Sequence, residues 1–184
     1  MADIQIMLTG SVGQSMVTRL LAETTERVGR GARSALVAIS SPGGNVYWGV
    51  TAYNFLRGLG IEVITHNVGQ VDSIGGALYV AGDRRFSVGQ GRFLIHSIHW
   101  TFAAGQAIPE KQIRDTLTQV EKERDNLATI LAERTGTSLD TVRADMGQGR
   151  ILDSAEALAY GLVQEIKEDV FDPGQEIVNI VGTD

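Results

Sequence analysis

The sequence predicts an α/β fold built around a mostly parallel sheet. Short apolar segments of strand length alternate with segments of helical period through the first half of the chain, which is typical of strand–helix–strand units. One of them, residues 35–39, is apolar throughout and includes β-branched side chains, as expected for a strand buried on both faces. Many of the 22 glycines lie next to these segments, where glycine permits tight turns.

The first two expected strands are separated by an amphipathic helix. Residues 4–8 are short, apolar and followed by a glycine, which favours a strand. In residues 17–28 the apolar side chains share one helical face, and Gly29 is placed to end the helix. The strand at 35–39 then leads directly into Ser-Pro-Gly-Gly at 41–44.

The alternation continues to residue 95. We expect a helix at about 46–57, which stops at a glycine, and a strand at 61–65. A short helix at 75–81 consists mainly of small residues and can therefore pack closely. Two further strands are expected near 85–88 and 92–95.

The pattern changes in the second half of the chain. From 109 to 134, apolar residues recur at near-heptad spacing with charged residues between them, which predicts one long amphipathic helix ended by Gly136. A helix of this length can also project and pair with a neighbouring subunit. Two short helices should follow, at 138–146 and from a capping box at 153–156, and a last apolar segment lies at 177–181.

The composition indicates one globular domain spanning residues 1–184, with 43% hydrophobic and 21% charged residues. No apolar stretch approaches the ~18 residues that a membrane span needs, and the first residues lack the features of a signal peptide. We therefore expect a cytoplasmic protein without a membrane partner. The net charge of −6 without a basic run argues against nucleic acid as a partner. The absence of cysteine excludes disulfides, thiolate catalysis and cysteine-based metal sites.

Serine-type hydrolysis needs an exposed hydroxyl, a base beside it and donors for a tetrahedral oxyanion. Ser73 is the candidate hydroxyl, because it lies between a strand and the first turn of a small-residue helix. The main-chain N–H of Ile74 would face the same space, near the positive end of that helix. The alternative interpretation is that Ser73 serves only as an N-cap.

The base and the remaining donors also have candidates at strand ends. His96 follows the strand at 92–95, although a histidine there can equally be a hydrogen-bonded structural residue. His96 and His99 together could suggest a metal, but no third ligand is evident, so we expect no metal. Gly43 and Gly44 offer bare N–H groups for an oxyanion and an edge for an extended peptide; a tight turn is the alternative. The three signals together are more specific than any one alone.

Over nearly its whole length the sequence resembles the proteolytic subunit of the Clp protease family. The resemblance implies a Clp-protease- and crotonase-like spiral of β–β–α units with a protruding handle helix at about 109–134. It also implies a homo-oligomeric ring, a heptamer or a double heptamer. The matching segments are Ser-Pro-Gly-Gly at 41–44, Gly-x-x-x-Ser-x-Gly at 69–75, Ile95-His96, Gly105-Gln106, residues 131–136, Ala155-Glu156-Ala157 and Tyr160-Gly161-Leu162.

The resemblance further implies a serine-type endopeptidase that hydrolyses peptide bonds of unfolded proteins or peptides. Ser73 would be the nucleophile that forms the acyl-enzyme, and His96 the general base. The N–H groups of Gly44 and Ile74 would form the oxyanion hole, and Gly43 with Gly44 would bind the substrate. No cofactor is implied.

Two departures from the family bear on function. Gly149 stands where the family has its catalytic aspartate, and loss of that carboxylate lowers kcat roughly 10⁴-fold in a trypsin-like triad. Asp145, Asp153 and Asp72 are the candidate replacements, and the absence of any third member is the other alternative. The chain also begins at the first strand, without the family's preceding helix and axial loops, so the resemblance predicts the ring more firmly than an AAA+ unfoldase partner.

Other functions stay open at this level. A catalytically impaired ring subunit, acting as a scaffold beside an active paralogue, is motivated by Gly149. An acyl-CoA-processing protein of the crotonase fold would also use main-chain oxyanion donors, but the pairing of Ser73 with His96 argues against it. A serine–lysine dyad would need Lys111 or Lys122 beside the serine, and both belong to the long helix.

Overall fold

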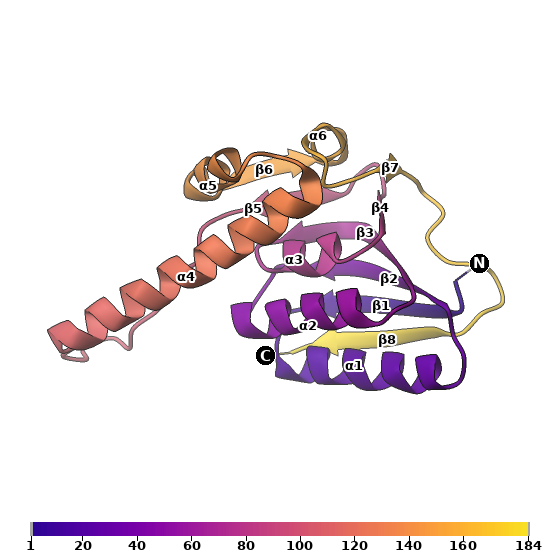
Figure 1. Cartoon of the computed structure of the whole chain (residues 1–184), viewed down its shortest axis with the longest axis horizontal. Coiled ribbons are helices and arrows are strands. Elements are labelled where there is room, and N and C mark those ends of the chain that lie inside the picture. The colour runs from indigo at the N-terminus through magenta and orange to yellow at the C-terminus, as the bar shows by residue number, and fades with distance from the viewer. Residues whose placement is uncertain (1, 184) are drawn as a thin grey trace.

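The fold is one mixed sheet with helices packed on it, in a computed structural model that describes residues 2–183 (Figure 1). The eight strands are β1 (Ile4–Gly10), β2 (Ser34–Ser41), β3 (Glu62–Asp72), β4 (Arg84–Ser87), β5 (Arg92–Ile95), β6 (Arg150–Asp153), β7 (Glu165–Ile166) and β8 (Ile177–Gly182). The main path of the sheet has the order β6-β5-β3-β2-β1-β8, while β4 pairs with β3 and β7 with β4. All these pairs are parallel except β5 with β6.

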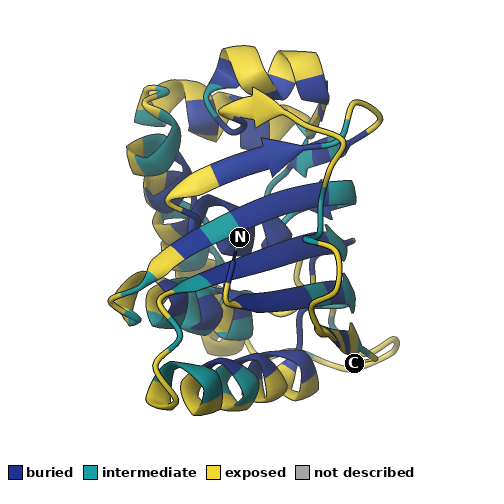
Figure 2. Cartoon of the chain, turned by 90° about the vertical axis from the view of Figure 1, so that its right-hand side faces the viewer, coloured by how far each residue is buried: buried dark blue, intermediate teal, exposed yellow. Residues whose placement is uncertain are grey.

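Six helices complete the described chain: α1 (Gln14–Gly29), α2 (Val46–Gly58), α3 (Gly75–Val80), α4 (Glu110–Thr135), α5 (Leu139–Gln148) and α6 (Ser154–Tyr160). In Figure 1, α1, α2 and α3 lie over one face of the sheet, and α5 and α6 lie next to β6. Figure 2 shows the strands buried over most of their length, whereas the helices keep an exposed outer face. The expected α/β architecture with a mostly parallel sheet is confirmed.

The second half of β3 positions the site. The sequence predicted a strand at 61–65, but β3 continues to Asp72. Its first part pairs with β4 and its second part with β5. Asn67 supports the transition, because its side chain donates to the carbonyl of Arg92 at 3.0 Å and accepts from the N–H of Gly69 at 3.0 Å. The strand therefore carries the chain directly to Ser73.

Two short strands were not expected from the sequence. β6 has four residues, of which only Leu152 is buried, and β7 has two exposed residues. Such segments carry no apolar pattern of their own. They become strands only through pairing with β5 and β4, which are distant in the sequence.

The long helix projects from the rest of the molecule (Figure 1). It spans Glu110–Thr135, close to the expected range, and ends at Gly136 in the left-handed conformation with φ of 79°. Its buried residues gather at its C-terminal end: Leu127, Ala128, Ile130 and Leu131. None of the residues 96–126, all of which the structure describes, is buried. We call residues 96–126 the arm and the rest of the described chain the body. Within residues 2–183, no helix has the length and apolar character required to span a membrane.

Candidate active site

Ser73 occupies a strained turn between β3 and α3. Its φ of 57° is the only positive φ of a non-glycine residue in the described chain, a conformation that costs of order 1–3 kcal/mol and that the surrounding structure must hold. The N–H of Ser73 donates to the carbonyl of Leu94 at 2.8 Å, and its own carbonyl accepts from the N–H of Gly76 at 3.0 Å. The N-cap of α3 is Ile74 rather than Ser73. Among the described residues, the hydroxyl of Ser73 makes no hydrogen bond and is therefore available for chemistry.

The Gly43–Gly44 segment lies against this turn. A Cβ on Gly43 would be 2.6 Å from the Cβ of Ser73, so only glycine fits there, and the φ of 92° also favours glycine. A Cβ on Gly44 would be 2.4 Å from the carbonyl oxygen of Val12. Val12 also holds the segment in place, because its N–H donates to the Gly43 carbonyl at 2.8 Å and its carbonyl accepts from the N–H of Asn45 at 2.8 Å.

Two N–H groups near Ser73 have no acceptor. The N–H of Gly43 donates to the hydroxyl of Ser41 at 3.1 Å, but in the described chain those of Gly44 and Ile74 donate to nothing. Ile74 has no exposed surface, and a buried main-chain N–H without an acceptor costs about 1–3 kcal/mol. Both groups are therefore suited to receive a ligand oxygen.

His96 directly follows β5 but does not contact Ser73 through a hydrogen bond in the described chain. Its Nδ1 lies 2.6 Å from the carbonyl oxygen of Ser97, and its ring stacks on that of His99 with centroids 5.1 Å apart. The bond from Ser73 to Leu94 brings the two segments together, since Leu94 lies two residues before His96. Catalytic hydrogen bonds are often not formed in ligand-free structures, so His96 stays the candidate base.

Cavities adjoin both sides of His99. One of about 400 Å³ is lined by Leu94, His96, Ser97, His99 and the turn at 146–149. The other, of about 310 Å³, is lined by residues 44–47, residues 98–100, Gln119 and Glu123. Together they run from the candidate oxyanion donor Gly44 past His96 to Gly149, and they offer space for a bound chain.

Two of the candidate third carboxylates are occupied elsewhere. Asp145 is held by Arg150 at 3.1 and 3.2 Å and by the hydroxyl of Tyr160 at 2.9 Å; burial and this bond raise the pKa of Tyr160. Asp153 caps α6, where it accepts from the N–H of Glu156 in the expected capping box. Neither carboxylate bonds to His96.

Gly149, which the resemblance matches to the catalytic aspartate of the Clp protease family, closes α5. It has a φ of 70° in the left-handed conformation, and its N–H donates to the carbonyl of Asp145. A Cβ built there would meet nothing within 4 Å. The position is therefore open toward the cavity that it shares with His96.

Asp72 is the remaining candidate and is buried beside the serine. Its Oδ2 accepts from Arg92 at 2.5 Å, and its side chain is 7% exposed. Burial raises the pKa of Asp72, an effect that the charges of Arg92 and His96 partly offset. Arg92 was not identified from the sequence. The signal that could have found it is its spacing from His96, because alternate residues of a strand share a face.

Comparisons with known proteins agree on one family. A family model described as Clp protease matches residues 1–170. The ATP-dependent Clp protease proteolytic subunit 2 of Chlamydia trachomatis serovar D is 32% identical over 132 residues, which cover 71% of this chain and 63% of that protein. An ATP-dependent Clp protease proteolytic subunit of Bacteroides fragilis is 33% identical, covering 71% of this chain and 62% of that protein.

The matched segment thus spans slightly less than two thirds of the length of these curated relatives. A solved structure of a ClpP1 mutant from Listeria monocytogenes superimposes with a TM-score of 0.80, at 24% identity, covering 90% of this chain and 91% of that chain. At this identity the likeness establishes the fold, including the expected spiral with its projecting helix. Residues 171–184, which include β8, lie outside the family match.

Proposed function

The chain belongs to the Clp protease family, and on this premise we propose that it is a serine-type endopeptidase acting on unfolded proteins or peptides. Family membership supports peptidase activity of the Clp type. The observation that carries the serine mechanism is the strained Ser73, whose free hydroxyl lies beside Gly43 and close to N–H groups that lack acceptors. Strained turns that present a serine at a strand–helix junction recur in hydrolases.

The proposed reaction proceeds through an acyl-enzyme. The Oγ of Ser73 attacks the scissile carbonyl carbon while His96 accepts its proton. The oxyanion then accepts hydrogen bonds from the N–H groups of Gly44 and Ile74. Protonation of the leaving amine by the imidazolium releases the first product, and a water molecule activated by His96 hydrolyses the ester. Gly43 and Gly44 provide the surface on which the peptide lies.

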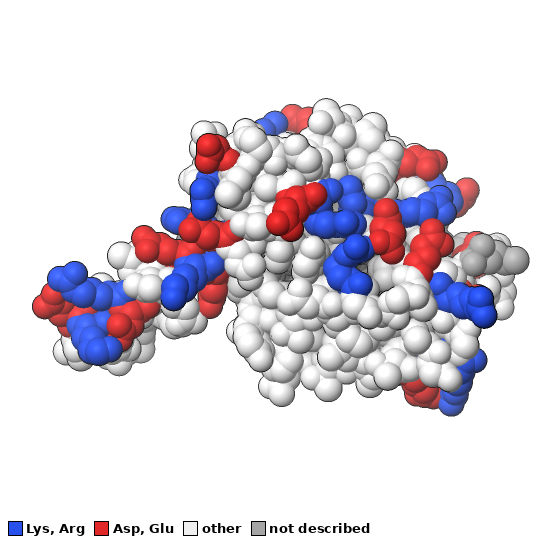
Figure 3. Space-filling view, viewed as in Figure 1, with Lys and Arg blue, Asp and Glu red and all other residues white. Residues whose placement is uncertain are grey.

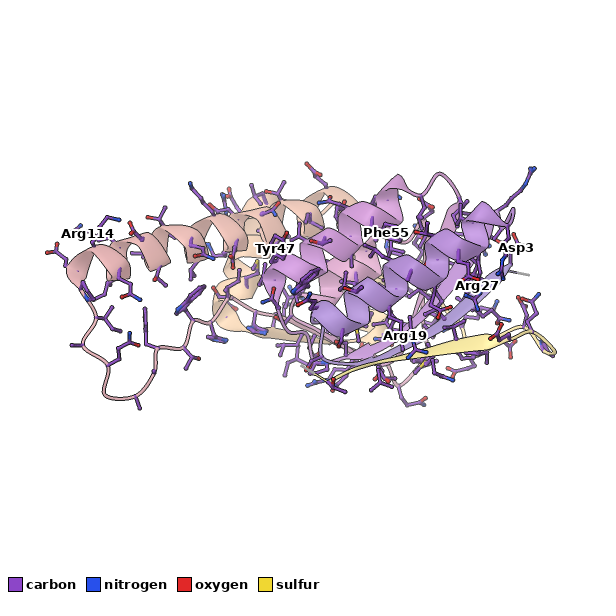
Figure 4. All side chains as sticks on the ribbon, turned by 90° about the horizontal axis from the view of Figure 1, so that it is seen from below. Asp3, Arg19, Arg27, Tyr47, Phe55 and Arg114 are labelled. Carbon is purple, nitrogen blue, oxygen red and sulfur yellow. The ribbon has the colours of Figure 1, made fainter. Side chains whose placement is uncertain are left out.

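We also propose that the protein acts in a homo-oligomeric ring, a heptamer or a double heptamer. Two apolar surfaces of the single chain support this. Figure 3 shows few charged side chains over α2, whose thirteen residues include one charged residue, Arg57. Tyr47, at the start of α2, is 69% exposed, and Figure 4 shows it on the same helix as Phe55. On α4, Ile113 and Leu117 are 51% and 57% exposed.

A partner ATPase is a further part of the proposal. The relatives are named as proteolytic subunits of ATP-dependent proteases, which supports an AAA+ unfoldase for this chain. Degradation of a folded substrate should then require ATP and such an unfoldase, whereas cleavage of short peptides should require neither.

The direct test is active-site labelling together with peptide cleavage by the assembled protein. A fluorophosphonate should label Ser73, and Ser73→Ala should abolish labelling and lower kcat at least about 10³-fold. Ser15→Ala, at an exposed position on α1, is the matched control and should behave as the unaltered protein. If the assembled protein is neither labelled nor active, the serine mechanism is wrong.

The impaired scaffold subunit is the second candidate, and the bonding of His96 favours it. In the described chain this imidazole bonds to a main-chain carbonyl and to no carboxylate. Gly149→Asp tests the scaffold directly, because aspartate tolerates the left-handed conformation better than most residues and the position is open. Activity that appears only in Gly149→Asp would support the scaffold, and efficient turnover by the unaltered protein would reject it.

A further inference from the structure

One buried carboxylate oxygen in the molecule has no partner. Of the buried side-chain nitrogen and oxygen atoms in residues 2–183, only Oδ1 of Asp72 makes no hydrogen bond. The same carboxylate is bound on its other oxygen by Arg92. Buried polar groups in folded proteins are almost always paired, so an unpaired oxygen points to a partner that arrives in another state of the site.

The register of the sheet places this carboxylate on the side of His96. β3 and β5 are parallel, with Asp72 opposite Leu94. Side chains alternate along a strand, so Arg92 and Leu94 share the face of Asp72. If the alternation continues one step beyond β5, position 96 lies on the same face. The bond from Arg92 to Asp72 confirms this orientation for one member of the series. Burial raises the pKa of Asp72, and the charges of Arg92 and His96 oppose this rise.

The turn at Ser73 permits neighbouring residues to serve one site. In a regular strand, residues 72 and 73 would point to opposite faces of the sheet. The left-handed φ of 57° at Ser73 ends this alternation. The nucleophile and a carboxylate can therefore approach one imidazole from consecutive positions in the chain.

The other candidate carboxylates, Asp145 and Asp153, are not available to His96. Asp145 and Asp153 are engaged by Arg150, Tyr160 and the start of α6. The turn facing His96 across its cavity consists of Met146, Gly147, Gln148 and Gly149, none of which is acidic. The charged or titratable groups around His96 are then Asp72 with its partner Arg92, and the stacked His99. Glu123 lies in the cavity on the other side of His99, where it accepts from Gln119 at 2.9 Å.

We propose that Asp72 is the positioning residue for His96, in the role that the family assigns to the position of Gly149. This inference rests on the proposed function of Ser73 and His96. In the assembled site, the Nδ1–H of His96 leaves the carbonyl of Ser97 and donates to Oδ1 of Asp72. The carboxylate then presents Nε2 to Ser73 and stabilises the imidazolium formed during attack. Arg92 holds the other oxygen and keeps the carboxylate in place.

The first test compares two isosteric substitutions in the full-length protein. Asp72→Asn should lower kcat about 10³–10⁴-fold and leave KM within about threefold, as expected for a group that acts on the transition state through the base. The matched control is Asp153→Asn, which keeps an N-cap residue of equal quality and should retain full activity. Unchanged kcat in Asp72→Asn would overturn the proposal.

Rescue distinguishes positioning from a structural role. In the double variant Asp72→Asn with Gly149→Asp, a carboxylate returns to His96 from the other side of the cavity, so kcat should recover about tenfold or more over Asp72→Asn. Removal of the carboxylate disfavours the imidazolium, so the rising limb of the plot of kcat/KM against pH should move to lower pH by about one unit in Asp72→Asn. In the double variant the limb should return to its position in the unaltered protein. Loss of activity without rescue and without movement of the limb would show that Asp72 only supports the fold.

A third measurement does not depend on a variant that folds. A crystal structure of the unaltered, phosphonylated protein should place Nδ1 of His96 within about 3.2 Å of Oδ1 of Asp72. Retention of the bond to Ser97 in that adduct would contradict the proposal. Failure of the proposed function is recognised separately, because it requires that Ser73→Ala remain active or that Ser73 not be labelled.

Discussion

The body and the arm are stabilised by different interactions. In the body, β2 contains five consecutive buried residues, 35–39, and main-chain bonds hold Ser73 at the end of β3. The arm has no buried residue, and its side chains form exposed ion pairs such as Arg114 with Glu110. Figure 4 shows Arg114 at the end of α4 that lies far from the sheet. The body therefore has a core of its own, whereas the apolar side chains of Ile113 and Leu117 on the arm are exposed in the single chain.

This difference divides the candidate active site. Ser73 belongs to the body, where Leu94 and Gly76 hold its main chain. His96 is the first residue of the arm and bonds to the arm's own Ser97. The proposed nucleophile is thus positioned by the core of the single chain, whereas the proposed base lies in a segment without buried residues.

The strongest test of this division uses one substitution at both ends of α4. Leu131→Ala removes a side chain that is 2% exposed, so it should lower the free energy of unfolding by about 2–5 kcal/mol. Leu117→Ala removes one that is 57% exposed and should change it by less than about 0.5 kcal/mol, while it weakens assembly of the ring. Urea denaturation and analytical ultracentrifugation measure the two effects. Equal losses of stability would show that the arm has a core.

A second comparison uses two arginines. Arg85 is buried in the body and donates to four carbonyls, those of Gly82, Arg134, Gly161 and Leu162. The ammonium group of lysine cannot reproduce the planar arrangement of N–H donors in the guanidinium group. Arg85→Lys should therefore lower the free energy of unfolding by about 2–3 kcal/mol. Arg114→Lys on the arm should be indistinguishable from the unaltered protein in thermal denaturation. If Arg85→Lys leaves the free energy of unfolding unchanged, the four hydrogen bonds of Arg85 do not stabilise the body as expected.

The smallest expected effect is on the pH dependence of the body. Burial lowers the pKa of His66, against the opposing effect of its hydrogen bond to the carbonyl of Lys167. The folded chain therefore binds this proton less well than the unfolded chain, whose histidine has a pKa near 6.5. Stability from this group is complete above pH 6.5 and declines as the pH falls below it, until the folded pKa is reached.

His66→Gln should remove this part of the decline. The free energy of unfolding, measured by urea denaturation at several pH values between 5 and 8, should fall less steeply toward acid in the variant. An identical slope in both proteins would show that His66 does not contribute.

The sequence was sufficient for most of the elements, because buried strands and amphipathic helices leave local patterns. Residues 35–39 and 92–95 became β2 and β5 with nearly the expected bounds, and Gly136 ends α4 as expected. β6 and the extension of β3 to Asp72 were missed. Both depend on pairing with β5, and such long-range pairing leaves little trace in a short polar segment.

What the sequence by itself determined was the identity of the candidate residues: Ser73, His96 and the glycines at 43–44 stand in local motifs with a characteristic spacing. Only the tertiary structure decided which candidate carboxylates are engaged away from His96. It engages Asp145 and Asp153 elsewhere and sets Asp72 opposite Leu94 in the pairing of β3 with β5. Periodicity fixes the face of a residue within its own strand, whereas the register between strands arises from packing of the whole chain.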